Sequence, residues 1–348
     1  MKKRFLSMLV LLVAVVTGAW AQEPATYKVT LQEGTEDATN WTIPAEAPAG
    51  SPVTATYNGS KKVKSVKAVV KGPVDLSKLD APYEAQDGEV LTGTLDVANH
   101  PVKISIAEGA TVTLAGVTIN GVNNNSYSWA GITCEGDATI ILKDGTTNTV
   151  KGFRASYPGI FVPKNKTLII KGGAQGTGKL IASSNNFQDD GSAGIGAGYE
   201  HPCGNIEIQG GDITATGGNL SAGIGGSAEG ACGNITISGG TIKATGAYLA
   251  AGIGSGWNTE NGCGNITITG GTIEATGGGY AAGIGSGVDH SSCGTIIITN
   301  GVTKVTATKG SGAPYSIGAG NGSSCGTVTI GGVEGAITNS PYTYQPSN

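Results

Sequence analysis

A segment of about thirty residues recurs along most of this chain, and the recurrence limits the possible folds more than any single motif does. The clearest copies read NIEIQGGDITATGG, NITISGGTIKATG and NITITGGTIEATGG, and they begin at Asn205, Asn234 and Asn265. Shorter or more degenerate copies begin at Thr111, Thr139, Thr167, Thr295 and Thr327. A Cys-Gly pair precedes each of the five C-terminal copies, with spacings of 29, 31, 30 and 32 residues. The chain therefore contains about eight units of one structural repeat.

Each unit holds three short stretches in which apolar and polar residues alternate, separated by glycine-rich turns. Alternation with a period of two is typical of a strand with one buried face. Three strands and three turns fill one coil of a parallel β-helix, in which each strand pairs with its equivalent in the next coil. A helical solenoid is disfavoured, because the 3.6-residue period is absent and each glycine would cost a helix about 1 kcal/mol. We predict an all-β fold: a right-handed parallel β-helix of about eight three-strand coils, preceded by a small β-rich N-terminal module.

Stacking of the coils predicts columns of inward aliphatic side chains, which would supply most of the stabilising free energy. Two columns belong to the first strand of each unit, one to the second and one to the third. The expected first-strand columns are Val112, Ile140, Leu168, Ile206, Ile235, Ile266, Ile296 and Val328, and Leu114, Leu142, Ile170, Ile208, Ile237, Ile268, Ile298 and Ile330. The second-strand column is Ile213, Ile242, Ile273 and Val305, and the third-strand column is Ile132, Ile160, Ile195, Ile224, Ile253, Ile284 and Ile317.

The N-terminus has the pattern of a secretory signal peptide. Three basic residues precede an apolar run from Phe5 to Val16, and Ala19-Trp20-Ala21 is a small-x-small cleavage site. A membrane anchor is the alternative, but the run is short for a membrane span and no later segment is long and apolar enough. We expect four parts: a signal peptide (1–21), a small β-rich module (22–72), a linker and N-terminal cap (73–110) and the β-helix (111–348). The protein would then be exported to the periplasm, the cell surface or the medium.

Charge and composition exclude one class of partner. The formal net charge is −4, only 13% of residues are charged, and loss of the three basic residues of the signal would leave −7. Nucleic acid is therefore an improbable partner, since phosphate contacts need clustered cations. Glycine is abundant, at 60 residues. Where glycines flank the inward isoleucine of the AGIGSG segments, they either permit a tight bend or leave a flat shelf for a ligand.

Cysteine and asparagine recur at fixed positions of successive units. Cys203, Cys232, Cys263, Cys293 and Cys325 lie along a line, whereas metal ligands must converge on a point. Disulfides between neighbouring coils are conceivable from the strand spacing, but five cysteines cannot all pair. We expect a buried thiol ladder that acts as small apolar filler, with Cys134 elsewhere in its coil. We also expect Asn205, Asn234 and Asn265 to form an amide ladder in which each side chain bonds the next coil.

The segments CGNITISGGTIKATG, AAGIGSG and YPGIFVPKNKTLIIKG resemble a group of secreted β-helix proteins of gut Bacteroidetes, over about residues 80 to 348. This resemblance implies a fold similar to that of pectate lyases and of clostridial β-helix domains that bind cellulose or polygalacturonate. Residues 27 to 71 resemble small β-rich repeat modules of bacterial surface proteins. Neither resemblance transfers a catalytic residue to this chain.

The loops that precede each Cys-Gly pair vary most between units, and all of them should leave the same corner of the coil. Variable loops on a rigid scaffold are where recognition usually lies. An exposed tryptophan among carboxylates and amides is typical of sugar binding, which combines an apolar platform with directional hydrogen bonds. A solvated edge with a stray tryptophan is the alternative. The candidate ligand-binding residues are Tyr199, His201, Glu229, Trp257, Glu260, Asp289 and His290.

Catalytic groups are sparse in this sequence. Asp189 and Asp190 form the single Asp-Asp pair, in a long loop that could hold Ca²⁺ or substrate but fits an ordinary polar loop as well. We therefore predict a non-catalytic protein, without a resident cofactor, that binds a polysaccharide or a glycoprotein surface through one loop edge. A structural or adhesive surface stalk is the second hypothesis. A polysaccharide lyase or hydrolase is the third.

Overall fold

The chain folds into two compact units, one formed by residues 1–74 with 88–90 and the other by residues 75–87 with 91–348. The structure is a computed structural model. It describes residues 72–122, 124–185, 191–259 and 261–347, and the backbone of six strands before residue 72. The predicted signal peptide lies outside the described residues except for β1. The six strands form two antiparallel three-stranded sheets: β1 (Met8–Val10), β5 (Val53–Tyr57) and β3 (Trp41–Thr42), and β4 (Glu46–Pro48), β2 (Thr26–Leu31) and β6 (Ala68–Val70).

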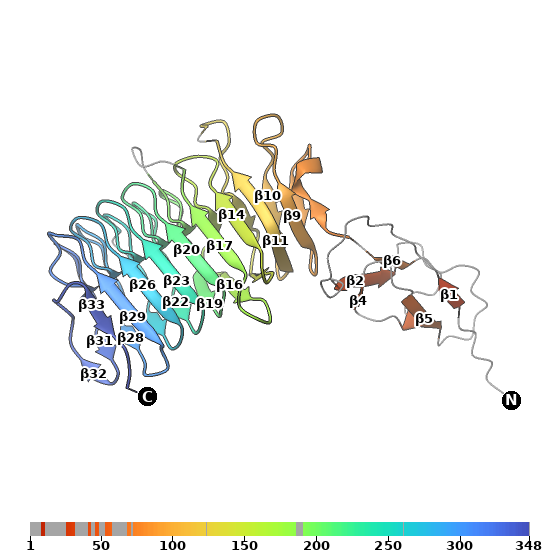
Figure 1. Cartoon of the computed structure of the whole chain (residues 1–348). Coiled ribbons are helices and arrows are strands. Elements are labelled where there is room, and N and C mark those ends of the chain that lie inside the picture. Colours follow the sequence, from red (N-terminus) through yellow and green to blue (C-terminus); the bar gives the residue numbers. More distant parts are fainter. Residues whose placement is uncertain are drawn as a thin grey trace. The chain divides into compact units, whose positions relative to one another are not determined.

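The larger unit is a parallel β-solenoid, as the repeat predicts. Seven complete coils follow one another in the described residues, and an eighth first strand begins after them. Figure 1 shows the equivalent strands side by side in sequence order, from β11 to β29. Residues 72–347, where described, contain no α-helix, only the short 3-10 helix η2 (Leu76–Lys78). The predicted fold class is confirmed.

Three sheets run along the solenoid. The first contains β11 (Thr111–Asn120), β13 (Ala138–Leu142), β16 (Thr167–Gly172), β19 (Asn205–Ile208), β22 (Ile235–Ile237), β25 (Ile266–Ile268), β28 (Ile296–Ile298) and β31 (Val328–Ile330). The second contains the end of β11, β14 (Thr147–Lys151), β17 (Lys179–Ser183), β20 (Asp212–Thr216), β23 (Thr241–Thr245), β26 (Thr272–Thr276) and β29 (Lys304–Thr308). The third contains β8 (Tyr83–Ala85), β10 (Ile104–Ile106), β12 (Ile132–Cys134), β15 (Ile160–Phe161), β18 (Ile195–Gly196), β21 (Ile224–Gly225), β24 (Ile253–Gly254), β27 (Ile284–Gly285) and β30 (Ile317–Gly318).

Short segments complete the two ends of this unit. At its N-terminal end lie β7 (Val74–Asp75) and β9 (Val90–Thr94). At the other end, β32 (Val333–Glu334) pairs antiparallel with β31, and β33 (Tyr342–Tyr344) pairs antiparallel with β29. The parallel stacking ends at these antiparallel strands. β33 pairs with the edge of β29 that the second strand of a further coil would otherwise occupy.

The aliphatic columns stack as predicted through most of the solenoid. In the two first-strand columns, every pair of residues in adjacent coils is the expected one, from Leu168 to Val328 and from Ile170 to Ile330. The third-strand column from Ile132 to Ile317 and the second-strand column from Ile213 to Val305 are also in register. All these side chains are buried. The core is therefore a set of continuous aliphatic columns along the solenoid.

One step of the predicted first-strand register is wrong by two residues. We expected Ile140 to stack on Leu168 and Leu142 on Ile170, but Ile140 pairs with Ile170 and Leu142 with Gly172. A shift of two residues keeps each inward side chain on the inward face, so alternation alone does not detect it. The copies that begin at Thr111 and Thr139 are therefore shifted together by two residues relative to the later copies.

Polar ladders fix the turns between the third and first sheets. Asn205 Oδ1 accepts a hydrogen bond from Asn234 N, Asn234 Oδ1 from Asn265 N, and Asn265 Oδ1 from Thr295 N, each at 2.9 Å. The predicted amide ladder is confirmed. Each carboxamide satisfies a backbone donor of the next coil, and the turns are held one above another.

Candidate functional site

The loop edge is the row of loops 198–202, 227–231, 256–262, 287–292 and 320–324, which precede the first strands of successive coils. Backbone hydrogen bonds join each loop to the next, from Glu200 N to Ala228 O (3.3 Å) and from Glu229 N to Trp257 O (3.2 Å). The series continues from Asn258 N to Val288 O (3.1 Å) and from Asp289 N to Asn321 O (3.2 Å). The loops thus stack in register, about 4.8 Å apart.

The residues at the tips of these loops have left-handed backbone conformations. The φ angles are 56° at Glu200, 56° at Glu229, 49° at Asn258 and 53° at Asp289, and the equivalent Gly322 has 66°. Such a conformation costs a non-glycine residue about 1 to 2 kcal/mol. The four side chains form a column of carboxylate and amide groups, of which Asn258 is half-buried and the others are exposed. Their oxygens can accept hydrogen bonds from a ligand lying along the edge.

Trp257 and Asp289 are brought into direct contact. The indole Nε1–H of Trp257 donates to Asp289 Oδ2 of the next coil at 2.9 Å. The tryptophan is half-buried rather than exposed as we expected, because its loop packs against the preceding coil, where Trp257 N donates to Leu220 O at 3.0 Å. The ring is therefore held in a fixed position and presents only part of its surface.

The remaining predicted site residues lie in neighbouring positions of the same edge. Tyr199 is half-buried and His201 is exposed, with the His201 ring 5.3 Å from that of Tyr157. His290 is exposed, and its backbone N–H donates to Gly322 O at 3.1 Å. Glu260, Asp189 and Asp190 lie outside the described residues. The cation hypothesis for the Asp-Asp pair therefore stays a prediction.

A polar groove of about 480 Å³ follows the inner side of the loop edge. Its lining comes from four successive coils: Lys164, Asn165, Pro202, Cys203, Gly204, Asn205, Glu229, Ala231, Cys232, Gly233 and Asn261. A second hollow of about 320 Å³ shares Glu229, Ala231 and Asn261 with it and adds Asn258 and Thr259. An ammonium group, several carboxamides and a carboxylate thus line one depression, and such groups can bond the hydroxyls of a polar ligand from several sides.

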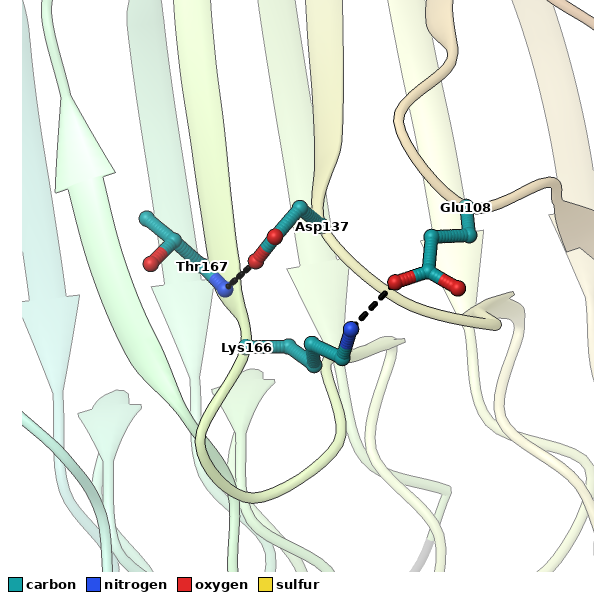
Figure 2. A network of polar contacts seen from close by, with 4 residues as sticks. All are labelled: Glu108, Asp137, Lys166 and Thr167. Atoms are coloured by element: carbon teal, nitrogen blue, oxygen red, sulfur yellow. Dashed lines mark hydrogen bonds and ion pairs between the residues drawn. The ribbon is translucent and has the colours of Figure 1, made fainter.

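Ion pairing holds the loop that contributes Lys164 and Asn165. Figure 2 shows Lys166 Nζ directed toward Glu108 of an earlier coil, with which it forms an ion pair. The hydrogen bond with Glu108 raises the pKa of Lys166. Asp137 Oδ1 accepts a hydrogen bond from Thr167 N at 2.7 Å (Figure 2). Both sides of this turn are therefore tied to neighbouring coils, which positions the end wall of the groove.

Sequence reasoning did not find Lys164, Asn165, Asn258 or Asn261 as site residues, and it assigned Asn205 a structural role only. Asn165 has a left-handed backbone with a φ of 66°, as do the loop-tip residues. Neighbouring turn residues of this kind, repeated in consecutive units, are the one sequence signal that could have located the groove.

Comparison with known proteins identifies the repeat. The family model of the beta helix repeat matches residues 206–228, 235–257 and 266–288. The chain carries β-helix repeats. Each matched segment begins at the first sheet and ends within the loop edge, so the repeat and the candidate site share residues. No curated protein and no solved structure matches the chain significantly. The helices in the described residues include none of the length and apolarity needed to cross a membrane.

Proposed function

We propose that this protein is an exported, non-catalytic binding protein that holds an extended carbohydrate chain, of a polysaccharide or a glycoprotein, along the loop edge. The observation that carries this proposal is the continuous polar groove from Lys164 to Asn261. Four successive coils each contribute a polar side chain to the lining, so an extended polymer with several hydroxyls can form hydrogen bonds with more than one coil. The half-buried ring of Trp257, which bonds Asp289 on the loop edge, adds a partly apolar surface to that edge.

The chemistry of the groove favours a neutral or weakly charged ligand. Glu229 and Lys164 contribute one negative and one positive group, and the remaining hydrogen-bonding side chains are amides, a hydroxyl and two buried thiols. In the described residues, no three His, Cys, Asp or Glu side chains are placed to hold a metal ion together. Binding through hydrogen bonds to hydroxyl groups is the recognition chemistry that this lining supports.

A glycan array of plant and mucin oligosaccharides, probed with the purified full chain, tests the proposal. We expect binding that falls about tenfold, or about 1.4 kcal/mol, in Glu229→Gln and in Asn261→Ala, because the first change replaces a charged acceptor with a neutral amide and the second removes a carboxamide of the groove. Lys304→Ala, an exposed change on the second sheet, is the matched control and should bind as the native protein does. If both groove variants bind as well as the native protein, the groove is not the binding site. Release of sugar ends from pectin would show that the protein is an enzyme and would contradict the proposal.

A surface stalk is the second candidate, and the division into two compact units favours it. A stalk would serve to hold the N-terminal unit, and the loop edge would then have no ligand. Failure of the full chain to bind any glycan on the array, with native-like folding shown by its circular dichroism, would favour the stalk over the binding protein.

A further inference from the structure

A column of cysteine thiols runs beside the groove. Each backbone N–H from Cys203 to Cys293 donates to the residue just before the next cysteine: Ala231, Gly262, Ser292 and Ser324 in turn, at 2.8 to 3.2 Å. The first four cysteines are 3% to 6% exposed and Cys325 is half-buried. All six cysteines of the chain are free thiols, and Cys134 lies apart on β12.

The sulfur atoms in this column contact one another. Cys203 Sγ lies 3.0 Å from Cys232 Sγ, and the thiol of Cys232 also bonds that of Cys263. Weaker contacts of 3.6 Å join Cys232 Sγ to Gly204 O and Cys263 Sγ to Gly233 O. Three thiols of adjacent coils thus share their protons along one line.

The line excludes most metal ions and leaves one class. Zinc needs four ligands that converge on a point, and stacked side chains of equivalent positions cannot supply them. A two-coordinate ion needs only two sulfurs on opposite sides. Two metal–sulfur bonds of about 2.3 Å span about 4.6 Å, which is close to the spacing of about 4.8 Å between paired strands. Thiolate ligands select soft ions such as Cu(I).

We propose that Cys203, Cys232 and Cys263 form a binding site for soft monovalent cations, Cu(I) or Ag(I), each held between the sulfurs of adjacent coils. Two cations enter and two protons leave, while the third thiol keeps its proton. The charge of the buried site is the same before and after the exchange, so burial does not oppose binding. No electron is transferred. Cys203 and Cys232 line the groove, which gives the ions a path from solvent.

The state of the thiols in the absence of metal agrees with this exchange. Hydrogen bonds with Cys203 and Cys263, together with burial, raise the pKa of Cys232 well above its ordinary value. The protons therefore stay on the column until an ion displaces them. A hydrogen-bonded proton between two sulfurs occupies the position that the cation takes.

Titration of the reduced full chain with Ag⁺, without oxygen and with a small excess of a monothiol competitor, tests the proposal. The competitor suppresses binding to single thiols. We expect Cys232→Ala to bind two fewer Ag⁺ and to release two fewer protons than the native protein, and Cys203→Ala to bind one fewer. Cys134→Ala, which removes a buried thiol outside the column, should bind as many as the native protein. Dialysis gives the metal count, and a pH indicator gives the proton count.

Two results would overturn the site. One is equal Ag⁺ uptake by the native protein and Cys232→Ala. The other is a count of fewer than six free thiols in the unreduced native protein, which would mean that neighbouring coils are joined by a disulfide instead. If Cys232→Ala does not fold, Cys203→Ala and Cys263→Ala decide, since each removes an end of the column and should lose one Ag⁺.

Discussion

Glycine at the third sheet illustrates how single residues set the spacing of the coils. Gly254 has a φ of 137°, and a Cβ added there would lie 1.8 Å from Gly285 O of the next coil. The segment around it is buried. These glycines therefore permit close approach of successive backbones. The flat, bare shelf that the sequence also allowed is not present at this position.

Gly254→Ala should destabilise the protein strongly, by about 3 kcal/mol or more, because it adds a steric clash to an unfavourable φ. Gly109→Ala is the matched control: its φ is 75°, but no atom lies within 4 Å of the added Cβ. The control should lose only about 1 kcal/mol. Urea unfolding of both variants measures the difference, and equal losses would show that the clash is relieved elsewhere.

The cysteines should differ widely in reactivity. A hydrogen bond from Cys293 lowers the pKa of Cys325, which is half-buried, whereas burial raises the pKa of Cys134 to about 12. At pH 8 a larger fraction of Cys325 is thiolate, and the thiolate is the reactive form. We expect iodoacetamide to modify Cys325 first and Cys134 last, as followed by mass spectrometry. Modification of Cys134 as fast as Cys325 would contradict these assignments.

At the scale of the strands, the inward columns contribute most to stability. Ile235 is completely buried in β22, while Ile297 on β28, two coils further along the same sheet, faces outward and is 39% exposed. Ile235→Ala should cost about 2 to 5 kcal/mol, and Ile297→Ala less than about 1 kcal/mol. Chemical denaturation compares the two. Similar losses would mean that the alternation of inward and outward residues is assigned to the wrong faces.

The same columns show what the sequence could predict. The register from Leu168 onward was predicted correctly, because the first strands of these copies align residue by residue although the loops between them differ in length. The step from Ile140 was wrong, since a two-residue shift preserves the inward face and only the turn geometry distinguishes the two pairings. The groove was missed for a related reason. Its lining depends on how the turns of several coils lie next to one another, which the sequence of a single turn does not give.

At the scale of the solenoid, the C-terminal end differs from the interior in having antiparallel strands. β32 and β33 pair antiparallel with the last strands and occupy edges that another molecule could otherwise use. Removal of residues 333–348 should therefore promote self-association, which light scattering after gel filtration would detect. Val333→Asn, at a position 71% exposed, should leave the association state unchanged. A truncated protein that stays monomeric at high concentration would show that these strands do not protect the end.

The stacking of equivalent residues in successive coils underlies the groove, the thiol column and the loop edge alike. A crystal structure of the full chain is the most direct measurement of it. The expected result is Ile206 above Ile235 above Ile266 at about 4.8 Å per coil, with Asn205 Oδ1 bonded to Asn234 N. An electron density map that places these isoleucines in different registers, or on different faces, would contradict the account.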